Sequence, residues 1–189
     1  MLSDLAECGI GLRDGDSVEW LYHEQTPVDP LVSRKALKKG GYEAVLIALG
    51  GERLTEDHQI LDGSSDDVWH FDIEFIEDHG AYVTIAERLC RMTRGDFRCE
   101  QIRDYVDVDA GIAWMELTCD GQTERLDLKV DNDWTDGKIF TYLQDRLIQT
   151  GSNRRYAAQS LGQDMLLVCL SPGDLARLNR VTGMRFEPC

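Results

Sequence analysis

The stretch from Ile112 to Val130 constrains the fold more than any other part of the chain. Its two halves, IAWMELTC and TERLDLKV, alternate apolar and polar residues, and the short connection Asp120-Gly121-Gln122 lies between them. Two alternating runs joined by a tight turn that contains glycine are typical of a β-hairpin. The sequence therefore predicts an antiparallel pair of strands here.

The elements expected from residue 68 onward follow the order β-α-β-β-β-α-β-β-α. Mixed strands and helices in this order predict an α+β fold, in which a mainly antiparallel sheet packs with helices. Ser171, followed by Pro172, is expected to cap the last helix, and Asp133 or Thr135 the helix before it. The expected elements are the strand 68–76, the helix 81–93, the extended segment 101–108, the two strands of the hairpin, the helix 138–150, the strands 154–161 and 164–170, and the helix 174–183.

The first 65 residues give weaker signals. Residues 32–39 suggest a short basic helical turn that Gly40-Gly41 interrupts, and residues 42–51 form an apolar segment that fits a helix or a strand. Residues 63–67 resemble a linker or a surface loop. We therefore predict a partly helical N-terminal segment, 1–65, followed by an α+β domain, 66–189, and the sequence leaves open whether the first packs as part of the second.

Acidic residues dominate the middle of the chain. The formal charge of the 189 residues is −15, and residues 61–136 contain 20 acidic and 7 basic side chains. Nucleic-acid binding needs clustered Lys and Arg, so we expect no direct contact with nucleic acid. Such a segment attracts a basic partner, although acidity also serves solubility alone.

The cellular location is predicted from the absence of a membrane-spanning run, of a secretory signal and of a disulfide pattern in the sequence. No apolar run approaches the ~20 residues that span a bilayer, and the N-terminus has neither a basic region nor a sustained apolar one. The six cysteines are scattered without a CxxC pair, which favours reduced thiols. We expect a cytoplasmic protein that does not bind membranes.

One face of the strand 68–76 carries candidate metal ligands. His70, Asp72 and Glu74 alternate along it, and His79 follows closely. Residues two apart on a strand lie ~6.5 Å from each other, so a complete ligand set needs a second element. A solvated strand face is the simpler interpretation, and we predict neither a metal nor another cofactor. The opposite face of the strand is expected to be apolar, with Trp69, Phe71, Ile73 and Phe75.

The hairpin offers an enzymatic alternative. Asp127 and Lys129 form a D-x-K pattern on one strand, with Glu116 on the partner strand and Glu87 on an earlier helix. This resembles the PD-(D/E)xK nucleases, in which carboxylates bind Mg²⁺ and a lysine polarises the attacking water. The chain lacks the Pro-Asp pair of that pattern, and its acidic surroundings repel phosphate. A metal-dependent nuclease or hydrolase therefore stays the alternative to a protein that is not an enzyme.

Acidic clusters interleaved with aromatic residues suggest a protein-binding surface. Exposed carboxylates steer a basic partner toward the surface, and aromatic side chains that lose water on contact anchor it. Ordinary solvated turns would show the same clusters. The candidate partner-binding residues are Asp66, Asp67, Asp72, Glu74, Glu77, Asp78, Asp104, Tyr105, Asp107 and Asp109.

Several sequence stretches together resemble a known group of bacterial proteins. They are WHFDIEFI with the helix YVTIAERL, then Asp131-Asn132-Asp133-Trp134, Gly162-Gln163-Asp164 and the closing LSPGD. Over residues 67–186 the chain is similar to immunity proteins, which are encoded beside secreted antibacterial toxins such as those of type VI secretion. The resemblance implies a cytoplasmic protein that binds a cognate toxin and blocks it, and several such proteins are acidic partners of nuclease toxins.

The function that we predict is therefore neutralisation of a basic toxin. The acidic surface between Asp66 and Asp109 would cover the active or substrate-binding site of the toxin, with Trp69 or Tyr105 among the candidate anchors. A non-catalytic adaptor for another partner would use the same surface. The sequence leaves the oligomeric state open.

Overall fold

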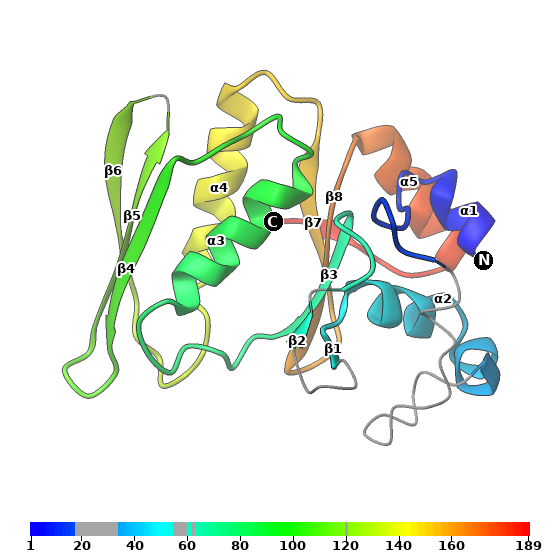
Figure 1. The fold of residues 1–189 in the computed structure, drawn as a ribbon, viewed down its shortest axis with the longest axis horizontal. Coiled ribbons are helices and arrows are strands. Elements are labelled where there is room, and N and C mark those ends of the chain that lie inside the picture. The colour runs from blue at the N-terminus through cyan, green and yellow to red at the C-terminus, as the bar shows by residue number, and fades with distance from the viewer. Residues whose placement is uncertain (18–33, 55–59, 62, 120) are drawn as a thin grey trace. The chain divides into compact units, whose positions relative to one another are not determined.

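The computed structural model describes residues 1–17, 34–54, 60–61, 63–119 and 121–189. It contains helices and antiparallel β-sheet, so the predicted α+β fold is confirmed (Figure 1). The chain divides into two compact units: unit 1 is Met1–Phe71 with Ala157–Pro188, and unit 2 is Asp72–Tyr156 with Cys189. The boundary that we predicted at residues 65 and 66 lies inside unit 1.

Unit 1 is built around a four-stranded sheet in the order β3-β8-β7-β9. The continuous apolar strand β8 is at its centre, and Leu166 to Leu170 are all buried there. The core of the unit also takes in Leu5, Leu46 and Leu49, so the N-terminal segment shares this core. The elements are α1 (Leu2–Ala6), α2 (Arg34–Gly50), β1 (Arg53–Leu54), β2 (Ile60–Leu61), β3 (Val68–Asp72), β7 (Arg155–Ser160), β8 (Asp164–Leu170), α5 (Pro172–Thr182) and β9 (Glu187–Pro188).

The structure decides two local predictions in unit 1. The apolar segment 42–51 is helical, as part of α2, and Gly41 interrupts that helix with a φ of 65°. Residues 63–67 are not a linker, because Ser64 and Ser65 are fully buried and bonded to the backbone of Arg13 and Leu49. Residues 32–33 of the predicted basic turn lie outside the described residues.

The start of α5 is capped as the sequence predicts. Ser171 Oγ accepts the N–H of Asp174 at 3.2 Å, and Pro172 stands in the first turn. Ser171 Oγ also donates to Asp174 Oδ2 at 2.7 Å. The cap is local in sequence, which is why it could be recognised without the fold.

Unit 2 consists of a three-stranded antiparallel sheet with two helices on one face (Figure 1). The predicted hairpin is confirmed as β5–β6, in which Met115 pairs with Leu126, while Asp120 of its turn lies outside the described residues. Met115, Leu117, Leu126 and Leu128 are buried on the side of the helices. No described element of unit 2 covers the other face. The elements are α3 (Ala81–Met92), β4 (Gln101–Asp107), β5 (Ile112–Cys119), β6 (Gln122–Leu128) and α4 (Lys138–Gln149).

Two predictions about unit 2 are wrong at its edges. The strand 68–76 ends at Asp72, because the Asp72 carboxylate accepts the N–H of Glu74 and turns the chain. As a result Phe75 is exposed and Ile76 is buried, the reverse of the expected alternation. Neither Asp133 nor Thr135 caps α4: the helix begins at Lys138, after Gly137, and the carboxylate of Asp136 accepts the N–H of Lys138.

None of the helices in the part of the chain that the structure describes is long and apolar enough to cross a membrane.

Candidate partner-binding surface

Three loops meet at one end of unit 2, where β4 ends, β5 begins and β6 ends (Figure 1). We call residues 72–80, 107–112 and 129–137 the acidic end. They contain nine carboxylates, against one lysine and one histidine. Lys129 forms an ion pair with Asp131, with 2.5 Å between its Nζ and Oδ2, so its charge is already compensated. The carboxylates are Asp72, Glu74, Glu77, Asp78, Asp107, Asp109, Asp131, Asp133 and Asp136.

Main-chain hydrogen bonds hold two of these loops together. The N–H of Thr135 donates to the carbonyl of Ile73, and the N–H of Ile76 donates to the carbonyl of Asp133, both at 2.8 Å. An antiparallel bridge joins Glu74 to Trp134 between them. Residues 73–76 and 133–135 therefore order each other, although they are far apart in sequence.

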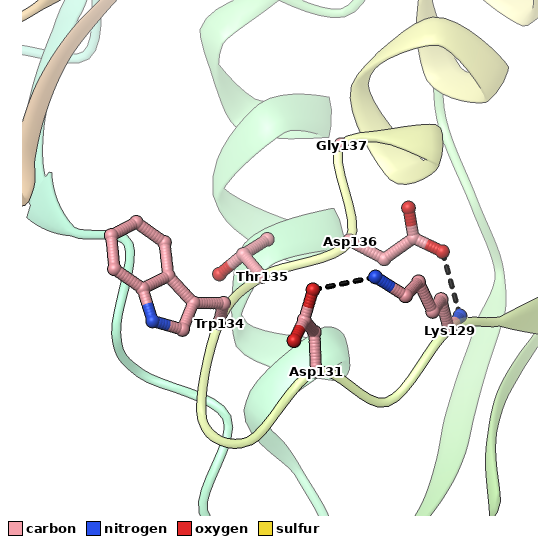
Figure 2. A pocket seen from close by; sticks show the side chains of 6 residues that line it. All are labelled: Lys129, Asp131, Trp134, Thr135, Asp136 and Gly137. Carbon is pink, nitrogen blue, oxygen red and sulfur yellow. Dashed lines mark hydrogen bonds and ion pairs between the residues drawn. The ribbon is translucent and has the colours of Figure 1, made fainter.

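The Asp136 carboxylate holds together the two ends of the loop 129–137 (Figure 2). Its Oδ2 accepts the N–H of Lys129 at 2.7 Å, and its Oδ1 accepts the N–H of Lys138 at 3.0 Å. Its own N–H donates to the Tyr82 hydroxyl at 3.1 Å. The loop lines a shallow depression, and the indole of Trp134 extends away from Asp136 and Lys129. The loop thus presents an aromatic side chain from a fixed backbone.

Large exposed hydrophobic side chains concentrate at the acidic end. Phe75 is 38% exposed, Ile112 48% and Trp134 39%, and these are three of the five such side chains among the described residues. Isolated exposed apolar side chains are common, but three of them within a set of nine carboxylates form an unusual combination. This combination of exposed hydrophobic groups and charge is what a protein-binding surface requires.

Tyr105 connects the acidic end to the uncovered face of the sheet. Its ring lies 4.7 Å from the ring of His79, whose Nδ1 is 2.9 Å from Asp78 Oδ1. On the sheet, Tyr105 pairs in register with Trp114, and their rings stack at 6.0 Å. The guanidinium of Arg125 lies 4.4 Å from the Trp114 ring centroid. An aromatic row therefore continues from the acidic end across β4 and β5.

Three of the ten predicted partner-binding residues make structural contacts within the protein. Asp67 is 2% exposed and accepts the N–H of Gly11 at 2.9 Å, and Asp66 pairs with Arg13 at 2.8 Å, both in unit 1. Asp104 faces the helices and accepts three N–H groups at the start of α3. Trp69, suggested as an anchor, is buried and stacked on Phe71 with 4.1 Å between the ring centroids.

The other seven predicted residues all lie in unit 2, at the acidic end or beside it. They are Asp72, Glu74, Glu77, Asp78, Tyr105, Asp107 and Asp109. Asp107 also accepts the N–H of Ala110 at 2.8 Å and so shapes the β4–β5 turn. Sequence reasoning missed the carboxylates of the loop 129–137 and the exposed Phe75, Ile112 and Trp134. The run Asp131-Asn132-Asp133-Trp134, an aromatic residue after two acids, was the available signal.

The alternative metal and nuclease groups are engaged in other contacts. His70 Nε2 lies 3.8 Å from Asp164 in unit 1, whereas Glu74 and His79 belong to unit 2. In the D-x-K pattern, Asp127 pairs with Arg125 at 2.9 Å, and Glu116 accepts from Arg103 at 2.7 Å. Among the described residues, no group of three or more His, Cys, Asp or Glu side chains has an arrangement suited to a metal ion.

Comparison of the chain with models of known protein families, with curated proteins and with solved structures finds no match.

Proposed function

We propose that this protein is a non-catalytic inhibitor that binds a basic protein through its acidic end. The observation that carries the proposal is the presence of Phe75, Ile112 and Trp134, all exposed, among nine carboxylates. In line with the resemblance to immunity proteins, the partner is a cognate antibacterial toxin with a positively charged active or substrate-binding site.

The two kinds of side chain have different tasks in this proposal. Carboxylates attract a basic partner over distances near the Debye length, about 8 Å at physiological salt, and mainly raise the association rate. An aromatic anchor such as Trp134 becomes desolvated in the complex and mainly slows dissociation. Because the main chain of Trp134 is held by the bridge to Glu74, little loop ordering opposes binding.

Several carboxylates of the acidic end are open to a partner. Glu77 and Asp109 are exposed, and Asp72 is exposed even though it accepts one main-chain N–H. A carboxylate has about four lone-pair sites, so a single internal hydrogen bond leaves room for an incoming Arg or Lys. A substrate-binding site for phosphate groups presents such basic side chains, which supports a nuclease-like toxin as the partner.

The direct test takes the products of the genes adjacent to the gene for this protein as candidate toxins. The candidate toxin is expressed in bacteria with and without this protein, and growth and complex formation are measured. We expect co-expression to restore growth and to yield a stable complex whose association rate falls as salt rises from 50 to 500 mM. Unrestored growth together with the absence of a complex would refute the proposal.

A charge-matched pair of variants locates the surface. The triple variant Glu77→Gln, Asp109→Asn, Asp131→Asn removes three exposed carboxylates from the acidic end. We expect association at low salt to slow by about tenfold, because steering scales with the local charge. The control variant Asp14→Asn, Asp145→Asn, Glu187→Gln makes the same charge change at other exposed positions and should stay within about twofold of wild type. Equal slowing by both variants would mean that net charge, and not this surface, drives association.

A further inference from the structure

Three cysteines converge at the other end of unit 2, where β4 begins and β5 ends. Cys90 lies in the last turns of α3, Cys99 precedes β4, and Cys119 is the last residue of β5. Cys99 Sγ is 3.4 Å from Cys90 Sγ and 3.0 Å from Cys119 Sγ. The fold thus places one central sulfur between two others that are 9 and 20 residues away in sequence.

These three residues are thiols in the structure, and each is partly exposed. The positions of the other three cysteines are different: Cys8 and Cys169 are buried in unit 1, and Cys189 lies at the C-terminus. The cluster is therefore a distinct chemical group that a small reagent can reach. It takes no part in the proposed partner-binding surface.

The surroundings of Cys99 favour its protonated form. The hydrogen bond with Cys90 and then burial raise the pKa of Cys99 well above its ordinary value, while the hydrogen bond with Cys119 and the charge of Arg146 on α4 act in the opposite direction. Burial, followed by the neighbouring Cys119 and Cys99, raises the pKa of Tyr142 to about 12. Because thiol–disulfide exchange requires a thiolate, reaction at this cluster should accelerate as pH rises.

The spacing of the sulfurs fits a disulfide better than a metal. Two thiolates on one tetrahedral zinc lie about 3.8 Å apart, given Zn–S bonds of about 2.3 Å. Both separations in this cluster are shorter, at 3.0 and 3.4 Å. A disulfide needs the sulfurs to approach to about 2.05 Å, a movement of about 1 Å for Cys99 and Cys119 that side-chain rotation can supply.

We propose that Cys90, Cys99 and Cys119 form a thiol–disulfide site in which Cys99 bonds to either neighbour. The oxidant is a small disulfide such as oxidised glutathione. One outer thiolate attacks it and forms a mixed disulfide, and a glutathione thiolate leaves. Cys99 then attacks the protein sulfur of that mixed disulfide and releases the second glutathione thiolate. The two protons lost by the cysteines end on the two glutathione thiols, so two protein thiols are oxidised and one glutathione disulfide is reduced.

The third cysteine lets the bond move without further oxidation. Starting from a Cys99–Cys119 disulfide, the Cys90 thiolate attacks the sulfur of Cys99 and forms Cys90–Cys99. Cys119 leaves as a thiolate and takes up the proton that Cys90 lost. The first disulfide links the ends of β4 and β5, whereas the second ties α3 to the start of β4. The two bonds thus cross-link different elements of unit 2.

The test oxidises the folded protein with glutathione disulfide and locates the bond by mass spectrometry. Free thiols are blocked after oxidation, and disulfide-linked peptides are mapped. We expect the number of free thiols to fall from six to four, with Cys99 linked to Cys119 or Cys90. The variant Cys119→Ser should form only Cys90–Cys99, and Cys90→Ser only Cys99–Cys119. The variant Cys99→Ser should keep its remaining thiols, and Cys189→Ser should behave as wild type.

Each other outcome would overturn the proposal. Wild type that keeps six free thiols at pH 8.5 has no such site. Oxidation of Cys99→Ser at the wild-type rate means that other cysteines react. Bound zinc that must be removed by a chelator before any thiol oxidises would make the cluster a metal site. Circular dichroism confirms that each variant is folded, and the Cys90→Ser and Cys119→Ser variants test the same sulfur independently.

Discussion

Asp104 offers the sharpest test of how unit 2 is held together. Its carboxylate accepts the N–H groups of Gly80, Tyr82 and Val83 at 2.7, 2.8 and 3.2 Å. Without Asp104 these N–H groups at the start of α3 would lack a side-chain acceptor, because the N-cap residue of the helix is Gly80, which has no side chain. Asp104 therefore caps from a neighbouring strand, more than 20 residues away in sequence.

The cost of removing this carboxylate follows from those three bonds. Loss of an ordinary N-cap costs about 1 kcal/mol, and a hydrogen bond to a charged group contributes about 1.5–3 kcal/mol. Because the site is partly open, water replaces some of the lost bonds, so we expect Asp104→Ala to lower the free energy of unfolding by about 2–3 kcal/mol. Asp104→Asn keeps one oxygen acceptor and should lose about half as much.

Urea denaturation measures the effect. With a slope of about 1.5 kcal/mol per M, the midpoint of Asp104→Ala should fall by about 1.3–2 M. Hydrogen exchange should show faster exchange at Tyr82 and Val83, whereas the control Asp109→Ala, at an exposed position, should leave both unchanged. A midpoint within about 0.3 M of wild type, with protection retained, would refute the capping role. If the Asp104→Ala protein were fully stable but bound its partner more weakly, Asp104 would be a partner-binding residue.

Three further predictions concern the surface, the pH dependence and the alternative activity. Trp134→Ala should weaken partner binding by about 2 kcal/mol or more, which is roughly thirtyfold in Kd. Surface plasmon resonance should show that the weakening comes mostly from faster dissociation. An unchanged Kd would exclude Trp134 as an anchor. Because the pKa of Tyr142 is raised to about 12, the folded chain holds its proton longer than the unfolded chain does. Stability from this residue is therefore complete below pH 10 and is lost between pH 10 and 12, which a comparison of Tyr142→Phe with wild type in alkaline denaturation checks. Finally, neither wild type nor Lys129→Ala should cleave DNA or RNA with Mg²⁺ or Mn²⁺, and cleavage that Lys129→Ala abolishes would revive the nuclease alternative.

Local patterns in the sequence were sufficient to predict most of the helices and strands after residue 68. The hairpin β5–β6 was recognised because alternation and turn chemistry are contained within twenty or so residues. The cap at Ser171 was equally local. The strand 68–76 was predicted too long for two reasons. The Asp72 carboxylate accepts the N–H of Glu74 and turns the chain, and residues 73–76 then bond to residues 133–135, which no window around residue 72 contains.

Only part of the candidate surface was predicted, because long-range contacts decide which carboxylates are exposed. Acidic residues of the middle segment were expected to face a partner, and charge alone does not distinguish exposed carboxylates from structural ones. Asp67 and Asp104 accept main-chain N–H groups from distant segments, so only the fold reveals their roles. The cysteine cluster is a still clearer case, because Cys90, Cys99 and Cys119 follow no recognisable spacing.

The hydrogen bonds between residues 73–76 and 133–135 join main chain to main chain. This has a consequence for which amino-acid substitutions the protein can accept during evolution. Main-chain hydrogen bonds impose few demands on side-chain identity. Positions such as Phe75 and Trp134 can therefore be exchanged for other residues while the frame that presents them persists. Single substitutions at these exposed positions would therefore change the binding specificity of the protein and leave its fold intact.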